Sequence, residues 1–239
     1  MAVGINNVYK KVLSLANKEQ RGYITPHEFN TFADQAQLEI FEQYFYDKNQ
    51  FTRTNGNDGE YSDIIHNLNE KIAVFERTTA IQSNGQILVD DFYRLGTVIY
   101  NPGTGEFTGT VLQEVESDEL LRMNSSLLLR PTETRPVYLR NSSSTLGHLI
   151  IGYPVSVQDN LVCTYIKKPR KPQWGYVVVN GRAMYDSDDS VTTNFELHLS
   201  EENELVYKIL KIAGIAIKRS DLASAGQGLE VAQVQQEKQ

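Results

Sequence analysis

The chain has 239 residues, of which 40% are hydrophobic and 22% are charged. This composition excludes a fully disordered chain, a collagen and a coiled-coil rod, and the length fits one large domain or two small ones. No stretch approaches the roughly 18 apolar residues that span a bilayer, and the first residues lack a signal-peptide pattern. The single cysteine, Cys163, excludes intrachain disulfides and a cysteine-built zinc site. We therefore expect a soluble intracellular protein.

Charge is unevenly distributed along the chain, which has 23 basic and 30 acidic residues and a net charge of −7. Between Arg130 and Arg182, eight basic residues stand against two acidic ones, a local charge of +6. The remainder has 15 basic and 28 acidic residues, a charge of −13. Such a distribution is either scatter of surface charge or complementarity to a partner, which would be another copy of the chain or a polyanion.

Three helices are expected in the N-terminal third. Apolar residues at three- and four-residue spacing predict a helix from Ile5 to about Gln20, where Gly22 follows as a cap. Thr25, Pro26 and Glu28 combine an N-cap, a proline at the first helical position and a capping box. The helix that begins there should extend to about residue 51, and a third apolar face runs over residues 61–75.

The middle of the chain changes to the alternation and β-branched composition of strands. Ser117 should begin a short helix or turn, and residues 101–105 should form a turn. Strands are expected at residues 87–89, 96–100, 107–115, 137–140, 149–153, 161–166, 176–179 and 195–199.

The chain then returns to helix. Ser200 precedes a run with glutamates in its first turn and basic residues at its end, which complements the helix dipole. The last residues, 221–239, form a weak helix that needs a partner, or a mobile tail. The candidate assembly residues of this tail are apolar: Leu222, Leu229, Val231 and Val234.

These elements predict an α+β fold, in which an α-helical bundle of three N-terminal helices and one C-terminal helix carries a β-rich insertion. The expected divisions are the N-terminal helices at 1–80, the insertion at 81–199, the returning helix at 200–220 and the tail at 221–239.

The clearest motif match is to a calcium-binding EF-hand loop. Residues from Asn17 to Glu28 place Gly22 at the turn, Ile24 at the central position and Glu28 at the last position. Arg21, however, stands where a carboxylate should ligate, and it repels calcium. The helix start already accounts for Thr25, Pro26 and Glu28, so we expect no metal at this loop.

No other catalytic or metal-binding pattern is found. The four histidines lack metal-pair spacing, and no nucleophile elbow, P-loop or dinucleotide-binding fingerprint occurs. Asp186, Asp188 and Asp189 form an acidic cluster that a solvated loop explains, and Cys163 lies in an apolar strand pattern typical of an inert thiol. We therefore expect a protein that is not an enzyme and uses no cofactor.

One segment combines cations with aromatic residues. Lys167, Lys168, Arg170 and Lys171 precede Trp174, the only tryptophan. Such a segment can bind phosphates and stack on bases. It can equally be a proline-stiffened connector in which Trp174 is an anchor and the cations are solvated or pair with a neighbouring subunit.

Three blocks of the sequence resemble virion structural proteins of short-tailed bacteriophages, including the crAss-like phages. The first block is Leu15 to Asn30, continued by Ala36 to Phe41. The second block is Thr164 to Pro169 with Trp174 to Tyr176, and the third runs from Phe195 to Ile215 with the Gln- and Glu-rich tail. The blocks span nearly the whole chain, and each has a structural character without catalytic identity.

The resemblance implies a head–tail connector or adaptor that forms a ring, often dodecameric, between portal and tail around the DNA channel. Its implied partners are copies of itself, the portal protein and other tail or connector proteins, with packaged DNA passing through the ring and no membrane. Its implied location is the virion, assembled in the bacterial cytoplasm. Two alternatives remain: a DNA-binding virion protein that uses Lys167–Lys171, and a degenerate calcium sensor built on Asn17–Glu28.

Overall fold

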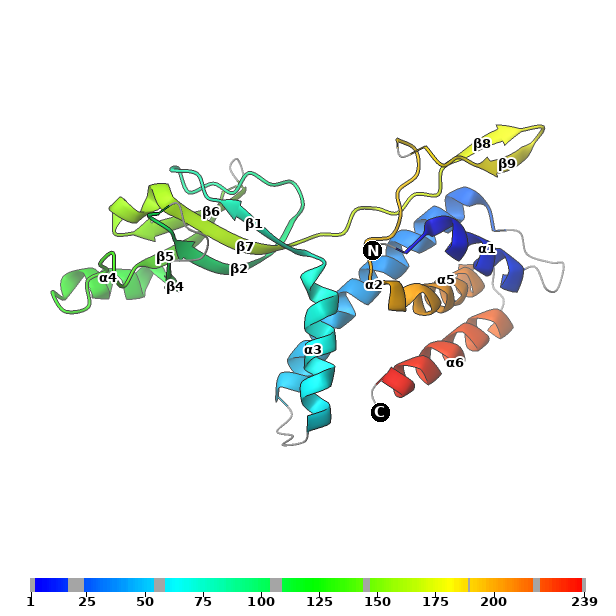
Figure 1. Cartoon of the computed structure of the whole chain (residues 1–239), viewed down its shortest axis with the longest axis horizontal. Helices are drawn as coiled ribbons and strands as arrows, with labels where there is room; N and C mark the ends of the chain where they lie inside the picture. The colour runs from blue at the N-terminus through cyan, green and yellow to red at the C-terminus, as the bar shows by residue number, and fades with distance from the viewer. Residues whose placement is uncertain are drawn as a thin grey trace. The chain divides into compact units, whose positions relative to one another are not determined.

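A computed structural model describes residues 3–16, 24–53, 59–103, 109–143, 147–188, 190–216 and 220–237. The chain divides into two compact units. Unit 1 comprises residues 1–74 and 169–239, and unit 2 comprises residues 75–168 (Figure 1). The fold is α+β, as predicted. The inserted unit begins at residue 75 and not at 81, so residues 75–80 belong to it and not to the N-terminal helices. It ends at residue 168, so residues 169–199, which the sequence placed in the insertion, belong to the helical unit.

Unit 1 is built from helices packed around a buried apolar centre. Its helices are α1 (Ile5–Ala16), α2 (Pro26–Arg53), α3 (Gly59–Ala73), α5 (Glu202–Ala216) and α6 (Ser220–Glu237). Helix α5 packs against α1, α2 and α6. Side chains from four parts of the chain are fully buried together in this unit, among them Ile5, Phe29, Phe195 and Ile209. The C-terminal residues predicted as a weak helix or a mobile tail are helical from Ser220 to Glu237.

The start of α2 has the predicted capping box. The Thr25 backbone N–H and hydroxyl both donate to Glu28 Oε2, at 2.9 Å and 2.7 Å, and the Glu28 N–H donates back to Thr25 Oγ1 at 3.3 Å. These hydrogen bonds from Thr25 hold the pKa of Glu28 below its ordinary value.

The strand predicted at residues 195–199 is wrong. Phe195 and Leu197 are fully buried, as the alternation indicated, but Phe195 forms only an isolated bridge with Val3. Leu199–Glu201 is a short 3-10 helix, η3. The alternation therefore identified the buried positions Phe195 and Leu197 but not the secondary structure of the segment.

Unit 2 contains two small sheets. Strands β1 (Glu76–Ala80), β7 (Leu161–Lys167), β2 (Phe92–Tyr100) and β3 (Thr110–Val111) form an antiparallel sheet in the order β1-β7-β2-β3. Strands β4 (Gln113–Glu114), β5 (Val137–Ser143) and β6 (Gly147–Tyr153) form the second sheet. Helix α4 (Ser117–Ser125) follows β4, and a 3-10 helix, η2 (Val155–Asn160), follows β6. A shared apolar core includes Val98, Ile150, Val157 and Leu161.

Two sequence expectations in unit 2 differ from the structure. Residues 87–89 form no strand; Gln86 makes an isolated bridge with Leu149. Strand β1 was not predicted, because its sequence Glu-Arg-Thr-Thr-Ala is mostly exposed and has no apolar alternation. It is a strand because it pairs with β7 along its whole length.

A two-stranded hairpin extends from the helices of unit 1 (Figure 1). Strand β8 (Tyr176–Val179) was predicted, and its partner β9 (Arg182–Tyr185) was not. Asn180 and Gly181 connect them with φ of 51° and 74°. Two positive φ values at an Asn-Gly pair are typical of the type I′ turn that closes tight hairpins.

Within the described part of the chain, no helix is both long enough and apolar enough to cross a bilayer.

Replacement of Thr25 by alanine tests the cap of α2. We expect Thr25→Ala to lower the free energy of unfolding by about 1 kcal/mol, because the N-cap hydroxyl and its two hydrogen bonds with Glu28 are lost, whereas the backbone N–H of residue 25 remains. Thr31→Ala, on the exposed part of the same helix, is the control and should change it little. Urea denaturation measures both, and equal losses in the two variants would contradict the capping role.

Candidate functional site

The predicted basic segment is divided between the two units. Lys167 and Lys168 end unit 2, and Arg170 and Lys171 belong to unit 1. Lys167 is buried at the end of β7, where its N–H donates to Phe75 O, whereas Lys168 is exposed and its N–H donates to Asp91 O.

The two cations that belong to unit 1 face carboxylates. Arg170 donates to Glu196 through both its backbone N–H and its Nε, at 3.1 Å and 3.0 Å. Lys171 Nζ lies 3.9 Å from Asp34 Oδ2. Both side chains are largely exposed, so these pairs are screened by water. The carboxylates nevertheless reduce the local positive charge available to a phosphate.

Trp174 is an internal anchor of unit 1. Its side chain is 3% exposed. Its ring stacks on Tyr9 with centroids 4.1 Å apart, and Tyr176 lies at 5.8 Å. Asn30 bonds both the N–H and the carbonyl of Trp174, and the indole N–H donates to Asn6. The indole therefore fixes the base of the hairpin, and stacking on a nucleic-acid base would require it to leave this site.

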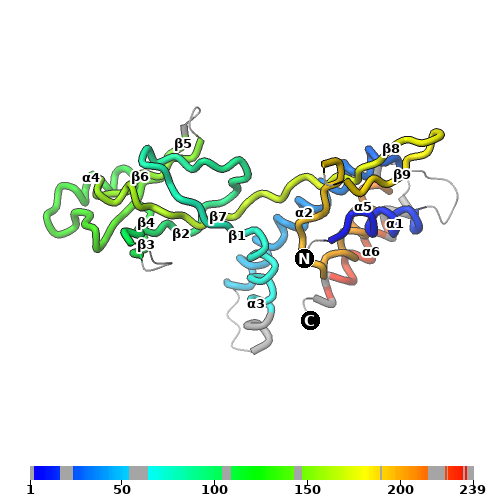
Figure 2. The backbone as a smooth tube through the Cα atoms, turned by 45° about the horizontal axis from the view of Figure 1, so that its top comes forward, coloured from blue at the N-terminus to red at the C-terminus, as the bar shows by residue number. Residues whose placement is uncertain are grey.

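Each unit presents an apolar projection to solvent. In unit 1 it is the hairpin β8–β9, whose exposed apolar side chains are Tyr176, Val177, Val178, Val179, Met184 and Tyr185. In unit 2 it is the leucine tip, defined as Leu127, Leu128 and Leu129, which are 94%, 83% and 56% exposed. The tip follows α4, at the end of unit 2 away from its junctions with the rest of the chain (Figure 2).

The backbone of the leucine tip is held in place by hydrogen bonds. The Arg130 N–H donates to Ser126 O at 3.0 Å, and Arg135 Nη2 donates to Leu128 O at 3.1 Å. A bridge between Thr132 and Arg135 closes the following turn. Three leucines are thus presented to water on an ordered backbone.

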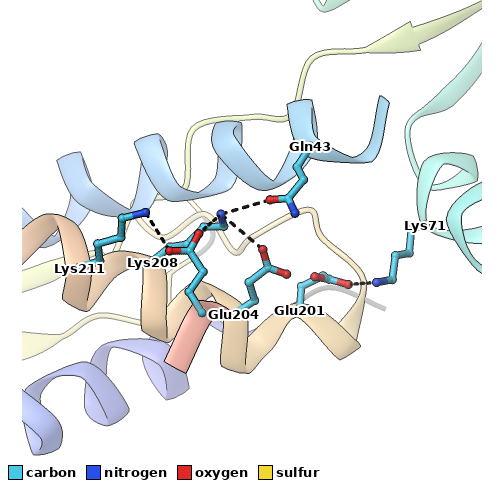
Figure 3. Close-up of polar contacts among 7 residues, drawn as sticks. Gln43, Lys71, Glu201, Glu204, Lys208 and Lys211 are labelled. Carbon is cyan, nitrogen blue, oxygen red and sulfur yellow. Dashed lines mark hydrogen bonds and ion pairs between the residues drawn. The ribbon is translucent and has the colours of Figure 1, made fainter. Parts of the chain in front are cut away.

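Helix α6 is attached to α5 by buried ion pairs. Glu230 accepts from Lys208 Nζ at 2.7 Å and from Lys211 Nζ at 2.9 Å. Figure 3 shows Lys208 directed also toward Gln43 and Glu204, at 3.3 Å and 3.5 Å. At Gly226 the two helices are so close that a Cβ would lie 2.9 Å from Lys211 N. Among the described side chains, the attachment of α6 therefore combines ion pairs with a close approach of the two backbones.

The charged partners of Lys208 and Glu230 together have a larger effect on the pKa values of these two residues than burial has. Burial disfavours the charged form of Lys208, but its hydrogen bond to Glu230 and the nearby carboxylates raise its pKa. Burial likewise opposes ionisation of Glu230, but the two lysines hold its pKa below the ordinary value.

Glu201 forms a second buried pair, with Lys71 at 2.6 Å (Figure 3). Burial opposes ionisation of Glu201, but the charge of Lys71 outweighs it and lowers the pKa.

A cavity of about 390 Å³ adjoins this pair in unit 1, between α2, α3 and residues 198–200. Its apolar walls are Phe51, Ile64 and Leu68, and Asp47 and Glu70 contribute carboxylates. Lys71, which also lines the cavity, is bonded to Glu201.

The structure describes only part of the EF-hand match. Asn17 to Gly22 lie outside the described residues, and Glu28 serves the helix cap. Across the described ranges, no group of three or more histidine, cysteine or acidic residues is arranged to hold a metal. Asp186 and Asp188 instead accept backbone N–H groups of the loop, and Asp189 lies outside the described residues. Cys163 is buried, and burial raises the pKa of its thiol to about 11.

The tail residues are partly described. Leu229 and Val231 are 46% and 49% exposed on α6. The side chains of Leu222 and Val234 lie outside the described residues.

Sequence reasoning missed the leucine tip, although a signal was present. Three consecutive leucines stand between Ser126 and the Arg130-Pro131 pair, and a short apolar run between turn residues is either a buried strand or an exposed contact.

No protein-family model matches the chain, and no curated protein sequence matches it.

Glu230→Gln tests how α6 is held. The variant keeps the size of the side chain but removes the charge that faces two lysines, so we expect a loss of roughly 1–3 kcal/mol in unfolding free energy and faster amide hydrogen exchange in α6. The control is Glu202→Gln, which removes a more exposed pair with Lys11 and should cost under about 1 kcal/mol. Unchanged exchange in α6 would contradict the role of Glu230.

The same contact gives a pH dependence with a fixed sign. The lowered pKa of Glu230 means that its contribution exists above the unfolded pKa of about 4.3 and is lost as pH falls through the folded pKa. The raised pKa of Lys208 means that its contribution exists below about 10.4 and is lost as pH rises through the folded pKa. Protection of α6 amides, corrected for intrinsic exchange, should therefore fall at both extremes, and in Glu230→Gln the acidic fall should be reduced.

Proposed function

We propose that this protein is a structural subunit of a phage virion, a head–tail connector or adaptor that forms an oligomeric ring between portal and tail around the DNA channel. The observation that carries the proposal is the pair of apolar projections, the hairpin β8–β9 on unit 1 and the leucine tip on unit 2. Monomeric proteins seldom leave such patches in water, and larger ones mark interaction sites. The resemblance of three sequence blocks to virion structural proteins supplies the virion context.

The two projections differ from each other, which suits a ring. A ring requires heterologous contacts, in which one surface of a subunit meets a different surface of the next. The uneven charge along the sequence adds complementarity between copies.

The basic segment gives less support to DNA binding than to a connector role. Arg170 and Lys171 face Glu196 and Asp34, and Trp174 is buried against Tyr9. We propose that the segment joins the two units and fixes the hairpin, and that DNA passes through the ring without tight binding.

Light scattering of the protein, alone and mixed with the portal protein of the same phage genome, tests this function. We expect the 27.1 kDa chain to join the portal ring in a fixed multiple, with negligible affinity for duplex DNA at physiological salt. A chain that stays apart from the portal at high concentration, or that binds DNA with a steep salt dependence, would contradict it. Replacing Lys168, Arg170 and Lys171 by alanine distinguishes the two results, because only a DNA-binding protein would then lose DNA affinity.

A further inference from the structure

We propose that the leucine tip of one copy inserts into the α2–α3 cavity of a neighbouring copy. This inference rests on the proposed function, which requires contacts between copies, and it names the two surfaces that meet. The tip leaves three leucines in water, and the cavity is lined on its apolar side by Phe51, Ile64 and Leu68.

The sizes of the two surfaces agree. A cavity of about 150 Å³ accommodates a benzene molecule, so the 390 Å³ of the α2–α3 cavity can receive two leucine side chains. Full burial of one leucine contributes about 1.5–3 kcal/mol. Because hydrogen bonds from Arg130 and Arg135 already order the tip, little conformational entropy is lost on insertion.

Exposed arginines stand beside the tip, and the cavity lining includes an exposed carboxylate. The residues that flank the tip include Arg130 and Arg135, both exposed. The lining of the cavity contributes the exposed carboxylate of Glu70. Insertion would therefore bring these arginines toward Glu70, which favours correct encounter between copies.

A second copy explains the tip better than a lipid surface does. Glu116, Asp118 and Glu119 stand at the start of α4, the helix that leads to the tip. Anionic headgroups would repel these carboxylates.

Disulfide trapping between two single-cysteine variants tests the contact. Leu128→Cys places a thiol on the tip and Asn67→Cys places one on an exposed lining position of the cavity. Since each chain carries only one of them, a Leu128–Asn67 bond can form only between different copies. The buried Cys163 is present in all variants, and the unmodified chain serves as the blank.

We expect the mixed variants to form, under mild oxidation, a covalent dimer at twice the 27.1 kDa chain mass. Two matched controls should not form it: Leu88→Cys, another exposed leucine of unit 2, in place of the tip, and Thr31→Cys, on the exposed face of α2, in place of the cavity. In addition, Leu128→Ala should weaken self-association by roughly 30-fold, as at an interface hot spot, and Leu88→Ala should not.

A yield no higher than that of the controls would overturn the inference. If the tip instead binds vesicles of phosphatidylcholine and phosphatidylglycerol, and Leu128→Asp abolishes that binding without trapping between copies, the partner is a lipid surface and the inference is wrong. The portal-binding experiment described above distinguishes a failure of this inference from a failure of the proposed function. Portal binding without trapping would overturn only the tip–cavity contact, and trapping without portal binding would overturn only the place in the virion.

Discussion

The exposure of Leu127, Leu128 and Leu129 is the constraint on which this account of the protein depends. Burying three such side chains is worth several kcal/mol, about 1.5–3 kcal/mol for each, and hydrogen bonds from Arg130 and Arg135 hold the segment out in water. That arrangement costs solubility and gives the isolated chain no stability. An ordered apolar projection of this kind is consistent with a subunit that is completed by a neighbour, as is the hairpin on the other unit.

For such contacts to form, unit 1 must hold the hairpin, helix α6 and the α2–α3 cavity in a defined arrangement. Polar interactions contribute much of that order. Trp174 stacks on Tyr9 and is hydrogen-bonded to Asn6 and Asn30. These contacts fix the base of the hairpin β8–β9. Lys208 and Glu230 attach α6, and Lys71 and Glu201 lie beside the α2–α3 cavity. Buried ion pairs contribute less net stability than apolar packing of the same volume, but they penalise alternative arrangements because an unpaired buried charge is costly. They therefore favour one defined geometry of the helices.

The sequence predicted the elements whose signals are local. The capping box of α2 follows from Thr25, Pro26 and Glu28 alone, and the apolar alternation of residues 161–166 is that of β7. The sequence-based prediction failed where the secondary structure of a segment depends on a partner segment distant in sequence. Strand β1 exists because β7 pairs with it, and Phe195 is buried in unit 1 without belonging to a strand, although its neighbours alternate like one. The α2–α3 cavity and the Lys208–Glu230 pair join residues far apart in the chain, and no pattern within a single segment could reveal them.

The central claim, that copies of this chain assemble by inserting the leucine tip into the α2–α3 cavity, is tested most directly by electron cryomicroscopy of the assembled particle. We expect a rotationally symmetric ring in which Leu127 to Leu129 of each copy lie against Phe51, Ile64 and Leu68 of the next. A ring in which the tip remains in solvent, or an assembled virion from which the protein is absent, would contradict it.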